Sequence, residues 1–156
     1  NEMPIRPDRL CAEITAALPA DAILVADTGY SGIWTSTLID LNGAGQTYLR
    51  AAGSLGWAFP ASLGAKCAAP NRQGWPNFLK MQGNKPGDPA EMLRFGPTDF
   101  AAIARGFGVR AIRVEDPSKI GPALREAIAA DETVVVDVVT DIDARAPAPW
   151  LPDGAT

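Results

Sequence analysis

The sequence predicts an α/β fold in three layers, a doubly wound and mostly parallel sheet with helices on both of its faces. Two observations lead to this prediction. Strand-like and helix-like stretches alternate along most of the chain, as they do in βα units. The stretch AILVAD, residues 22–27, is apolar up to its final Asp, and a strand without alternation suits a parallel sheet that is covered on both faces. With 156 residues and 47% hydrophobic side chains, the chain is long enough for one domain with its own core.

The first βα junction predicts a site for an anion. Residues 1–6 are interpreted as the end of a linker, and Asp8 is the expected cap of a first helix. After the strand at residues 22–27 comes the turn D-T-G-Y-S, in which Thr28 and Ser31 are the expected caps of the next helix. A strand, a glycine turn and a helix start together offer backbone N–H groups and the positive end of a helix dipole.

The stretch TYLRAAGSLGWAFPASLGAKCAAP, residues 47–70, organises the rest of the chain. It predicts a strand at residues 47–51, a tight Gly-Ser-Leu-Gly turn, and a helix with Pro60 in its first turn. Glycine allows positive φ angles and a close approach of a ligand to the backbone. The spacing matches neither the P-loop motif nor the G-x-G-x-x-G dinucleotide fingerprint. We therefore expect a ligand on the turn backbone, with Leu55 as the bulky apolar side chain presented there.

Regular patterns fail between the two halves of the chain and then return. Residues 71–97 are rich in proline and glycine and follow neither the strand nor the helix period, so residues 74–97 are predicted to be a loop. Thr98 is the expected cap of the next helix. A strand at residues 110–115, a helix from Asp116 onward and a strand at residues 134–139 follow, and residues 146–156 are predicted to be an extended tail.

Composition excludes several classes of function. The net charge of −4 disfavours nucleic acid and anionic membranes as partners, because both require basic patches. The chain has no histidine, which excludes Ser-His-Asp and Cys-His catalysis and histidine metal sites. Cys11 and Cys67 are interpreted as buried free thiols in a reducing compartment. No stretch is apolar enough to span a membrane, and we predict a cytoplasmic protein.

Three segments resemble one family, the thiamine-diphosphate enzymes of the acetolactate synthase and pyruvate decarboxylase group. GSLGWAFPASLGAK is similar to that family's G-x-M/L-G-x-x-x-P-A-x-x-G-A segment, and ILVADTG resembles the strand and D-x-G loop that open the same domain. Residues 98–141 resemble its closing helix–strand–helix–strand. The segments stand in the family's order and cover most of the chain, so residues 7–145 are identified as a C-terminal diphosphate-binding domain.

The resemblance implies two cofactor-binding loops. The first receives the diphosphate, mainly through backbone N–H groups, and comprises Asp27, Thr28, Gly29, Tyr30 and Ser31. The second lies against the rings of the cofactor and comprises Gly53, Ser54, Leu55 and Gly56. In the family, the carbonyl at the position of Gly53 accepts from the 4'-amino group, and the side chain at the position of Leu55 is the wedge that holds the cofactor bent. Without the resemblance, the first loop is equally an ordinary βα turn. For Leu55 the alternative is a core residue, which the flanking glycines disfavour.

The resemblance also implies a reaction and a gap. The family uses thiamine diphosphate and Mg²⁺ to decarboxylate a 2-oxo acid and to join or release the aldehyde unit. Its metal ligands, an Asp in G-D-G and an Asn in N-N, belong to a strand–helix–strand segment for which we find no match; Asp88 follows no apolar strand. The deficit falls near residues 72–74. Either the segment is deleted, or the printed sequence joins the two sides of a segment that is ordered only when cofactor and metal are bound. The second explanation is favoured, because the loss of central strands would disrupt the sheet.

No catalytic residue is expected in this chain. In the family, the activating glutamate belongs to a pyrimidine-binding domain, usually that of a partner subunit, and the full-length protein is expected to be a homo-oligomer. The chain alone is therefore expected to be inactive. Two alternatives stay open: a small subunit of a split thiamine-diphosphate-dependent decarboxylase, and a metal-less remnant that acts as an interaction or scaffold domain. The sequence does not identify the 2-oxo acid.

Overall fold

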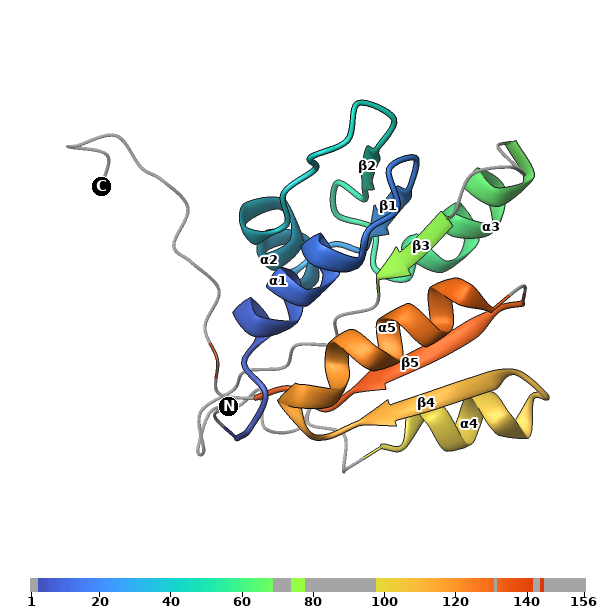
Figure 1. Ribbon diagram of the computed structural model, residues 1–156. Helices are drawn as coiled ribbons and strands as arrows, with labels where there is room; N and C mark the ends of the chain where they lie inside the picture. The colour runs from blue at the N-terminus through green and yellow to red at the C-terminus, as the bar shows by residue number, and fades with distance from the viewer. Residues whose placement is uncertain (1–2, 69–73, 78–97, 131, 142–143, 145–156) are drawn as a thin grey trace, which may run out of the picture.

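A computed structural model describes residues 3–68, 74–77, 98–130, 132–141 and 144, and it confirms the predicted α/β class. The first half contains α1 (Pro7–Ala17), β1 (Ile23–Ala26), α2 (Tyr30–Leu38), β2 (Thr47–Arg50), α3 (Ala58–Ala68) and β3 (Gly74–Asn77). The second half contains α4 (Phe100–Gly106), β4 (Arg110–Val114), the 3₁₀ turn η2 (Pro117–Lys119), α5 (Ile120–Ala129) and β5 (Val134–Val138). Figure 1 shows both halves. In the described part of the chain, no helix combines the length and the apolar character that crossing a membrane requires.

The first half builds a parallel sheet around β1. The strand order is β2-β1-β3, with Ile23 opposite Thr47 on one side and opposite Gly74 on the other. All four residues of β1 are buried, which explains why its sequence is apolar without alternation. Successive side chains of a strand point to opposite faces, and Ile23 and Val25 share one face, where they pack against Ala58 of α3. β1 is therefore the rigid centre of this half.

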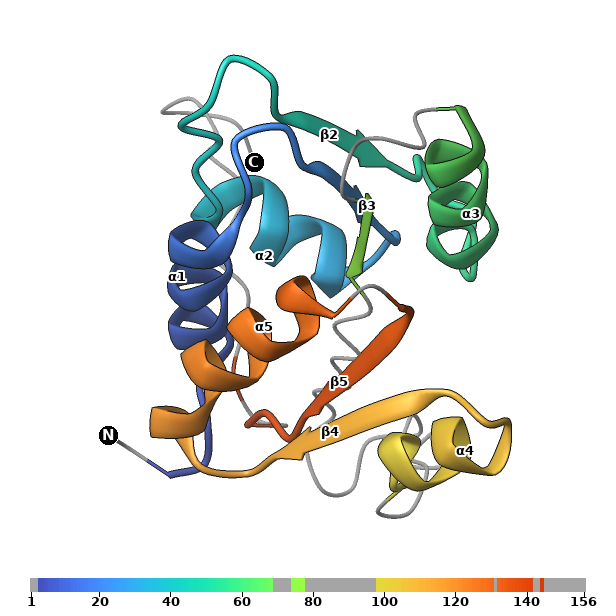
Figure 2. The same cartoon turned by 45° about the vertical axis from the view of Figure 1, so that its right-hand side comes forward.

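The second half builds a separate two-stranded parallel sheet from β4 and β5. Both helices of this half pack on it, α4 on one side and α5 on the other (Figures 1 and 2). The N-terminal segment reaches the same sheet, because Ile5 forms a parallel bridge with Thr140 and its carbonyl accepts from the N–H of Asp141 at 2.7 Å. Ile5 is 1% exposed. This part of the predicted linker is thus a component of the folded core.

The main core lies where α1 packs against α2 and α5. Its buried members come from both halves of the chain, which ties the halves together: Ile5, Leu10, Cys11, Ile14, Trp34, Val114, Ile120, Ala123, Leu124 and Ala144. Cys11 is buried, as the sequence predicts, whereas Cys67 is exposed, so the prediction of two buried thiols is wrong for Cys67. Alanine-rich surroundings do not by themselves specify which face of a helix is covered.

The predicted helix caps differ from the structure at four positions. The N-cap of α1 is Arg6, with Pro7 as the first helical residue and Asp8 within the first turn. Proline is favoured at that first position because its missing N–H would be unpaired there. The N-cap of α4 is Asp99 rather than Thr98, and its Oδ1 accepts from the N–H of Ala102 at 2.7 Å. The other two positions, Thr28 and Ser31, belong to the site below.

The loop predicted for residues 74–97 is wrong over its first four residues. Gly74–Asn77 forms β3, parallel to β1, and residues 78–97 lie outside the described residues. A buried strand must pair its backbone groups on both sides, and β3 supplies the second set of partners for β1. Pro76 has no backbone N–H, which is tolerated in an edge strand. The requirement comes from the neighbouring strand, so the composition of residues 74–77 does not reveal it.

Candidate functional site

The two glycine loops predicted from the sequence meet at one edge of the first sheet. β1 and β2 run parallel with Ala26 opposite Arg50, so both strands end at the same edge. The pairing continues one step further, where Ala51 donates its N–H to the carbonyl of Ala26 at 3.2 Å. The first loop, residues 27–31, leaves β1 there, and the second loop, residues 51–57, leaves β2 there. In open parallel sheets this is the edge at which ligands bind.

The first loop turns directly into α2. Gly29 is the N-cap with φ of 77°, a conformation that glycine adopts without strain, and no side chain caps the helix. The hydroxyl of Ser31 donates instead to the carbonyls of Thr28, at 3.0 Å, and Asp27, at 3.3 Å. Thr28 and Ser31 are therefore not the caps that the sequence predicts. The first N–H groups of α2 have no acceptor within the helix and suit an anion.

The second loop presents its backbone and one apolar side chain to solvent. Gly53 has φ of 123° and Gly56 has φ of 81°, and a Cβ built on either would meet no atom within 4 Å. Glycine is thus required there by the backbone conformation, and the space beside it is open. Leu55 is 84% exposed, which contradicts the interpretation of Leu55 as a core residue. Its role as a wedge beneath the cofactor stays a prediction.

The carboxylate of Asp27 connects the two loops. Asp27 is only 8% exposed. Its Oδ1 accepts from the N–H of Thr28 at 2.8 Å, within the first loop. Its Oδ2 accepts from the N–H of Ala58 at 3.4 Å, at the end of the second loop and the start of α3. The side chain therefore faces protein N–H groups on both loops.

Arg50 lies beside the first loop, and the sequence analysis did not single it out. A Cβ built on Gly32, in the first turn of α2, would lie 2.7 Å from Nε of Arg50 and 2.7 Å from the carbonyl oxygen of Asp27. The guanidinium thus covers the start of α2. Among the described residues, no carboxylate pairs with Arg50. The available signal was its place at the end of the strand before the glycine loop.

The described residues suit an anion better than they suit a metal ion. Unpaired N–H groups, glycines and the charge of Arg50 favour a diphosphate at this edge. Within the same described ranges there is no cluster of three or more His, Cys, Asp or Glu side chains. The carboxylate of Asp27 is engaged with N–H groups and is not presented as a metal ligand. The described part of the chain therefore fits the diphosphate and does not supply a Mg²⁺ site.

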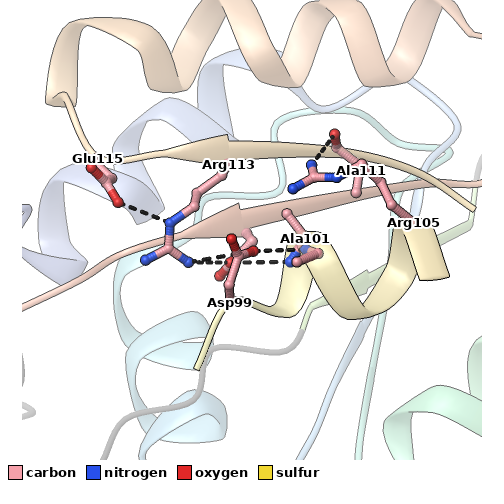
Figure 3. A network of polar contacts seen from close by, with 8 residues as sticks. Asp99, Ala101, Arg105, Ala111, Arg113 and Glu115 are labelled. Carbon is pink, nitrogen blue, oxygen red and sulfur yellow. Dashed lines mark hydrogen bonds and ion pairs between the residues drawn. The ribbon is translucent and has the colours of Figure 1, made fainter. Parts of the chain in front are cut away.

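A second polar network lies in the other sheet and has a structural role. Nη1 of Arg113 is 2.7 Å from Oδ2 of Asp137. Nε of Arg113 is 2.8 Å from Oε1 of Glu115 (Figure 3). Asp137 also accepts from the N–H of Ala101 at 3.3 Å. Asp99 completes the group, with 3.8 Å between its Oδ1 and Nη1 of Arg113. The network joins α4, β4 and β5 and contains no residue of the two glycine loops.

Known proteins that are similar to this chain share one kind of domain. Residues 73–138 match the C-terminal TPP-binding domain of the thiamine pyrophosphate enzymes; thiamine pyrophosphate is thiamine diphosphate under another name. The chain is 28% identical to a benzoylformate decarboxylase of Pseudomonas aeruginosa over 88% of its own residues. It is 25% identical to a probable acetolactate synthase large subunit of Methanococcus aeolicus over 99% of them. These matches support a C-terminal TPP-binding domain like that of acetolactate synthases and decarboxylases. The resemblance found in the sequence is thereby confirmed.

The thiamine pyrophosphate enzymes that it matches are much longer. The chain spans about a third of their length, 33% for each of these two and 29% for the acetolactate synthase large subunit of Corynebacterium glutamicum, to which it is 24% identical. The match to the Methanococcus aeolicus protein runs over 199 positions, whereas this chain has 156 residues. At least 43 of those positions therefore hold no residue of this chain.

Proposed function

We propose that this chain holds the diphosphate of thiamine diphosphate in a Mg²⁺-dependent 2-oxo acid decarboxylase or carboligase of the acetolactate synthase type, and that it is inactive by itself. One observation carries the proposal: two loops with positive-φ glycines, Gly29 in one and Gly53 and Gly56 in the other, leave adjacent parallel strands at the same edge. The match to the C-terminal TPP-binding domain supports thiamine diphosphate as the ligand.

In this proposal, the first loop binds the diphosphate and the second loop contacts the rings of the cofactor. The N–H groups at the start of α2 and its dipole attract the negatively charged diphosphate, and Arg50 adds a positive charge beside them. Gly53 and Gly56 let the second loop approach the rings, and Leu55 supports them from below. When bound, thiamine diphosphate supplies a ring that accepts the electron pair released as the 2-oxo acid loses CO2.

The rest of the machinery is proposed to come from outside the described residues. The Mg²⁺ ligands would belong to positions that the relatives have and this chain lacks, which the longer alignments support. These positions would also complete a continuous sheet between β3 and β4, in three layers. A pyrimidine-binding domain, in a homo-oligomer, would supply the activating glutamate. A cytoplasmic location belongs to the same proposal, and the free thiols Cys11 and Cys67 suit it.

A titration tests the proposal. Thiamine diphosphate is titrated into the 156-residue chain in a calorimeter, with Mg²⁺ and with EDTA, and thiamine serves as the control because it lacks the diphosphate. We expect binding of thiamine diphosphate and none of thiamine, because the charged group is what the first loop recognises. Equal affinity for the two compounds, or no binding of either at millimolar concentration, would contradict the proposal. A higher affinity with Mg²⁺ than with EDTA would show that the metal contributes to binding by this chain.

A second candidate is a non-catalytic interaction domain. It is favoured by the lack of a metal-binding cluster in the described residues, since Mg²⁺ commonly links protein carboxylates to substrate phosphates. The same titration distinguishes the two candidates. An interaction domain does not bind thiamine diphosphate, with Mg²⁺ or without it, also when the titration is repeated with a longer form of the protein, and so gains no stability from the compound.

A further inference from the structure

We propose that Asp27 is a positioning residue, whose buried carboxylate locks the second glycine loop to the first so that both present their backbones to one ligand. The identity of that ligand rests on the proposed function. Asp27 lies in the first cofactor loop, where the resemblance implies contacts made mainly by backbone N–H groups. The structure gives its side chain a different task.

The geometry excludes a direct contact between this carboxylate and an anion. Both oxygens of Asp27 accept hydrogen bonds from backbone N–H groups, from Thr28 at 2.8 Å and from Ala58 at 3.4 Å. The residue is buried, and its negative charge would repel a diphosphate. The bond from Thr28 has the length of a charge-assisted hydrogen bond, and the bond from Ala58 is longer. The side chain therefore acts on the protein rather than on the ligand.

The two bonds fix the ends of both loops. Thr28 is the residue that follows Asp27, so the first bond sets the conformation of the first loop. Ala58 is 31 positions further along the chain and begins α3, so the second bond ties the end of the second loop to the end of β1. The opposite end of the second loop is already held by the N–H of Ala51 on Ala26. With both ends held, Gly53 and Gly56 keep one arrangement.

The bond to Ala58 limits the freedom of the second loop before any ligand arrives. Gly53 and Gly56 have open space around them, and glycine has more backbone freedom than any other residue. Ala58 is fully buried, so its N–H loses its described partner if the carboxylate is removed. A loop that must be ordered upon binding lowers the affinity for the ligand. The expected consequence is a loss of cofactor affinity with the reaction step left intact.

The test compares Asp27→Asn with a matched control in the other sheet, Asp99→Ala. Asp27→Asn keeps the shape but places an NH₂ group against one of the two N–H donors. Asp99→Ala also removes a carboxylate from a backbone N–H, that of Ala102, far along the chain from the loops.

In the holoenzyme we expect the KM for thiamine diphosphate to rise about tenfold in Asp27→Asn, since a hydrogen bond to a charged group is lost, with kcat at saturating cofactor unchanged. Asp99→Ala leaves both values unchanged. An unchanged KM in Asp27→Asn, or an equal rise in both variants, would overturn the proposal.

Hydrogen exchange separates this inference from the proposed function. If the wild-type protein does not bind thiamine diphosphate, the proposed function fails. The positioning role of Asp27 is then tested by amide exchange in the absence of ligand. The amide of Ala58 is then expected to exchange at least tenfold faster in Asp27→Asn than in the wild type and at the wild-type rate in Asp99→Ala. Should Asp27→Asn not fold, the wild type decides: the amide of Ala58 must be better protected than those of residues 53–57. Exchange at the same rate as those loop amides would refute the positioning role.

Discussion

Gly32 illustrates how tightly the first loop is packed. It lies in the first turn of α2, where a Cβ would come within 2.7 Å of the carbonyl oxygen of Asp27 and of Nε of Arg50. The arginine end can move aside, but the backbone oxygen cannot move without disturbing the loop. We expect Gly32→Ala to reduce the free energy of unfolding by about 1–3 kcal/mol, the usual cost of overpacking. Urea denaturation measures the change.

Gly64 provides the control for that substitution. It lies within α3, and a Cβ there would meet no atom within 4 Å. Inside a helix, alanine has an intrinsic helix propensity that is more favourable than that of glycine by roughly 1 kcal/mol. Gly64→Ala is therefore expected to stabilise the chain. If Gly32→Ala were as stabilising as Gly64→Ala, the inference that Gly32 is closely packed would be contradicted.

Because the thiol of Cys11 is buried, we expect the folded chain to lose stability at high pH. Burial, and to a smaller extent the charge of Asp8, raises the pKa of the Cys11 thiol from 9.0 to about 12. At pH 7 the thiol is neutral in both the folded and the unfolded chain. As the pH rises from 9 towards 12, only the unfolded chain ionises, so stability falls by up to about 1.4 kcal/mol per pH unit.

The contribution of Cys11 is measured by denaturation at pH 8 and pH 10.5. Cys11→Ala removes the titrating group, so this variant is expected to lose less stability than the wild type between the two values. Cys67→Ala is the matched control, because Cys67 is exposed, and it should follow the wild type. Identical pH dependence in Cys11→Ala and the wild type would contradict the burial of Cys11.

At the same scale, the sequence was informative about glycines and less so about side chains. It anticipated positive φ at Gly53 and Gly56, because small residues in a tight turn have few other uses. It did not anticipate the contact between Asp27 and Ala58, which joins residues 31 positions apart. A motif orders residues along the chain, whereas such a contact depends on how two loops meet in space.

Among the elements, the small sheet depends on Asp137. Its carboxylate accepts from Arg113 and from the N–H of Ala101, and Ala101 is fully buried. Asp137→Ala leaves both donors without this partner, and we expect a loss of about 1–3 kcal/mol in the free energy of unfolding. Glu115→Gln is the control, because Glu115 also binds Arg113 but is 64% exposed. It is expected to change stability by less than about 0.5 kcal/mol. Equal effects would contradict the structural role of Asp137.

The order of the elements was predictable, and their ends were less so. An unbroken apolar run located β1, and apolar side chains at helical spacing located α1 and α5, because both signals reflect burial. The ends of the helices depend on single residues such as Pro7 and Asp99, where several neighbours are equally suitable caps. β3 was missed because its strand conformation is imposed by β1.

For the whole molecule, the two sheets are separate in the described residues, and several apolar side chains on α3 and α4 are exposed. They are Phe59 and Leu63 on α3 and Phe100 and Ile103 on α4, with Phe107 at the end of α4. The alignment with the Methanococcus aeolicus relative contains at least 43 positions that hold no residue of this chain. A sequence resemblance identifies the segments that are present. It does not give the structure of the sheet edges that face the absent positions.

Hydrogen–deuterium exchange of the 156-residue chain shows whether the two glycine loops together receive the diphosphate. Exchange is compared without ligand, with thiamine and with thiamine diphosphate. We expect thiamine diphosphate to slow exchange at residues 27–33 and 51–58 together and to leave the amides of β4 and β5 unaffected. Thiamine is expected not to slow exchange at residues 27–33. Protection elsewhere in the chain, or equal protection of residues 27–33 by thiamine, would contradict the binding of the diphosphate by the two loops together.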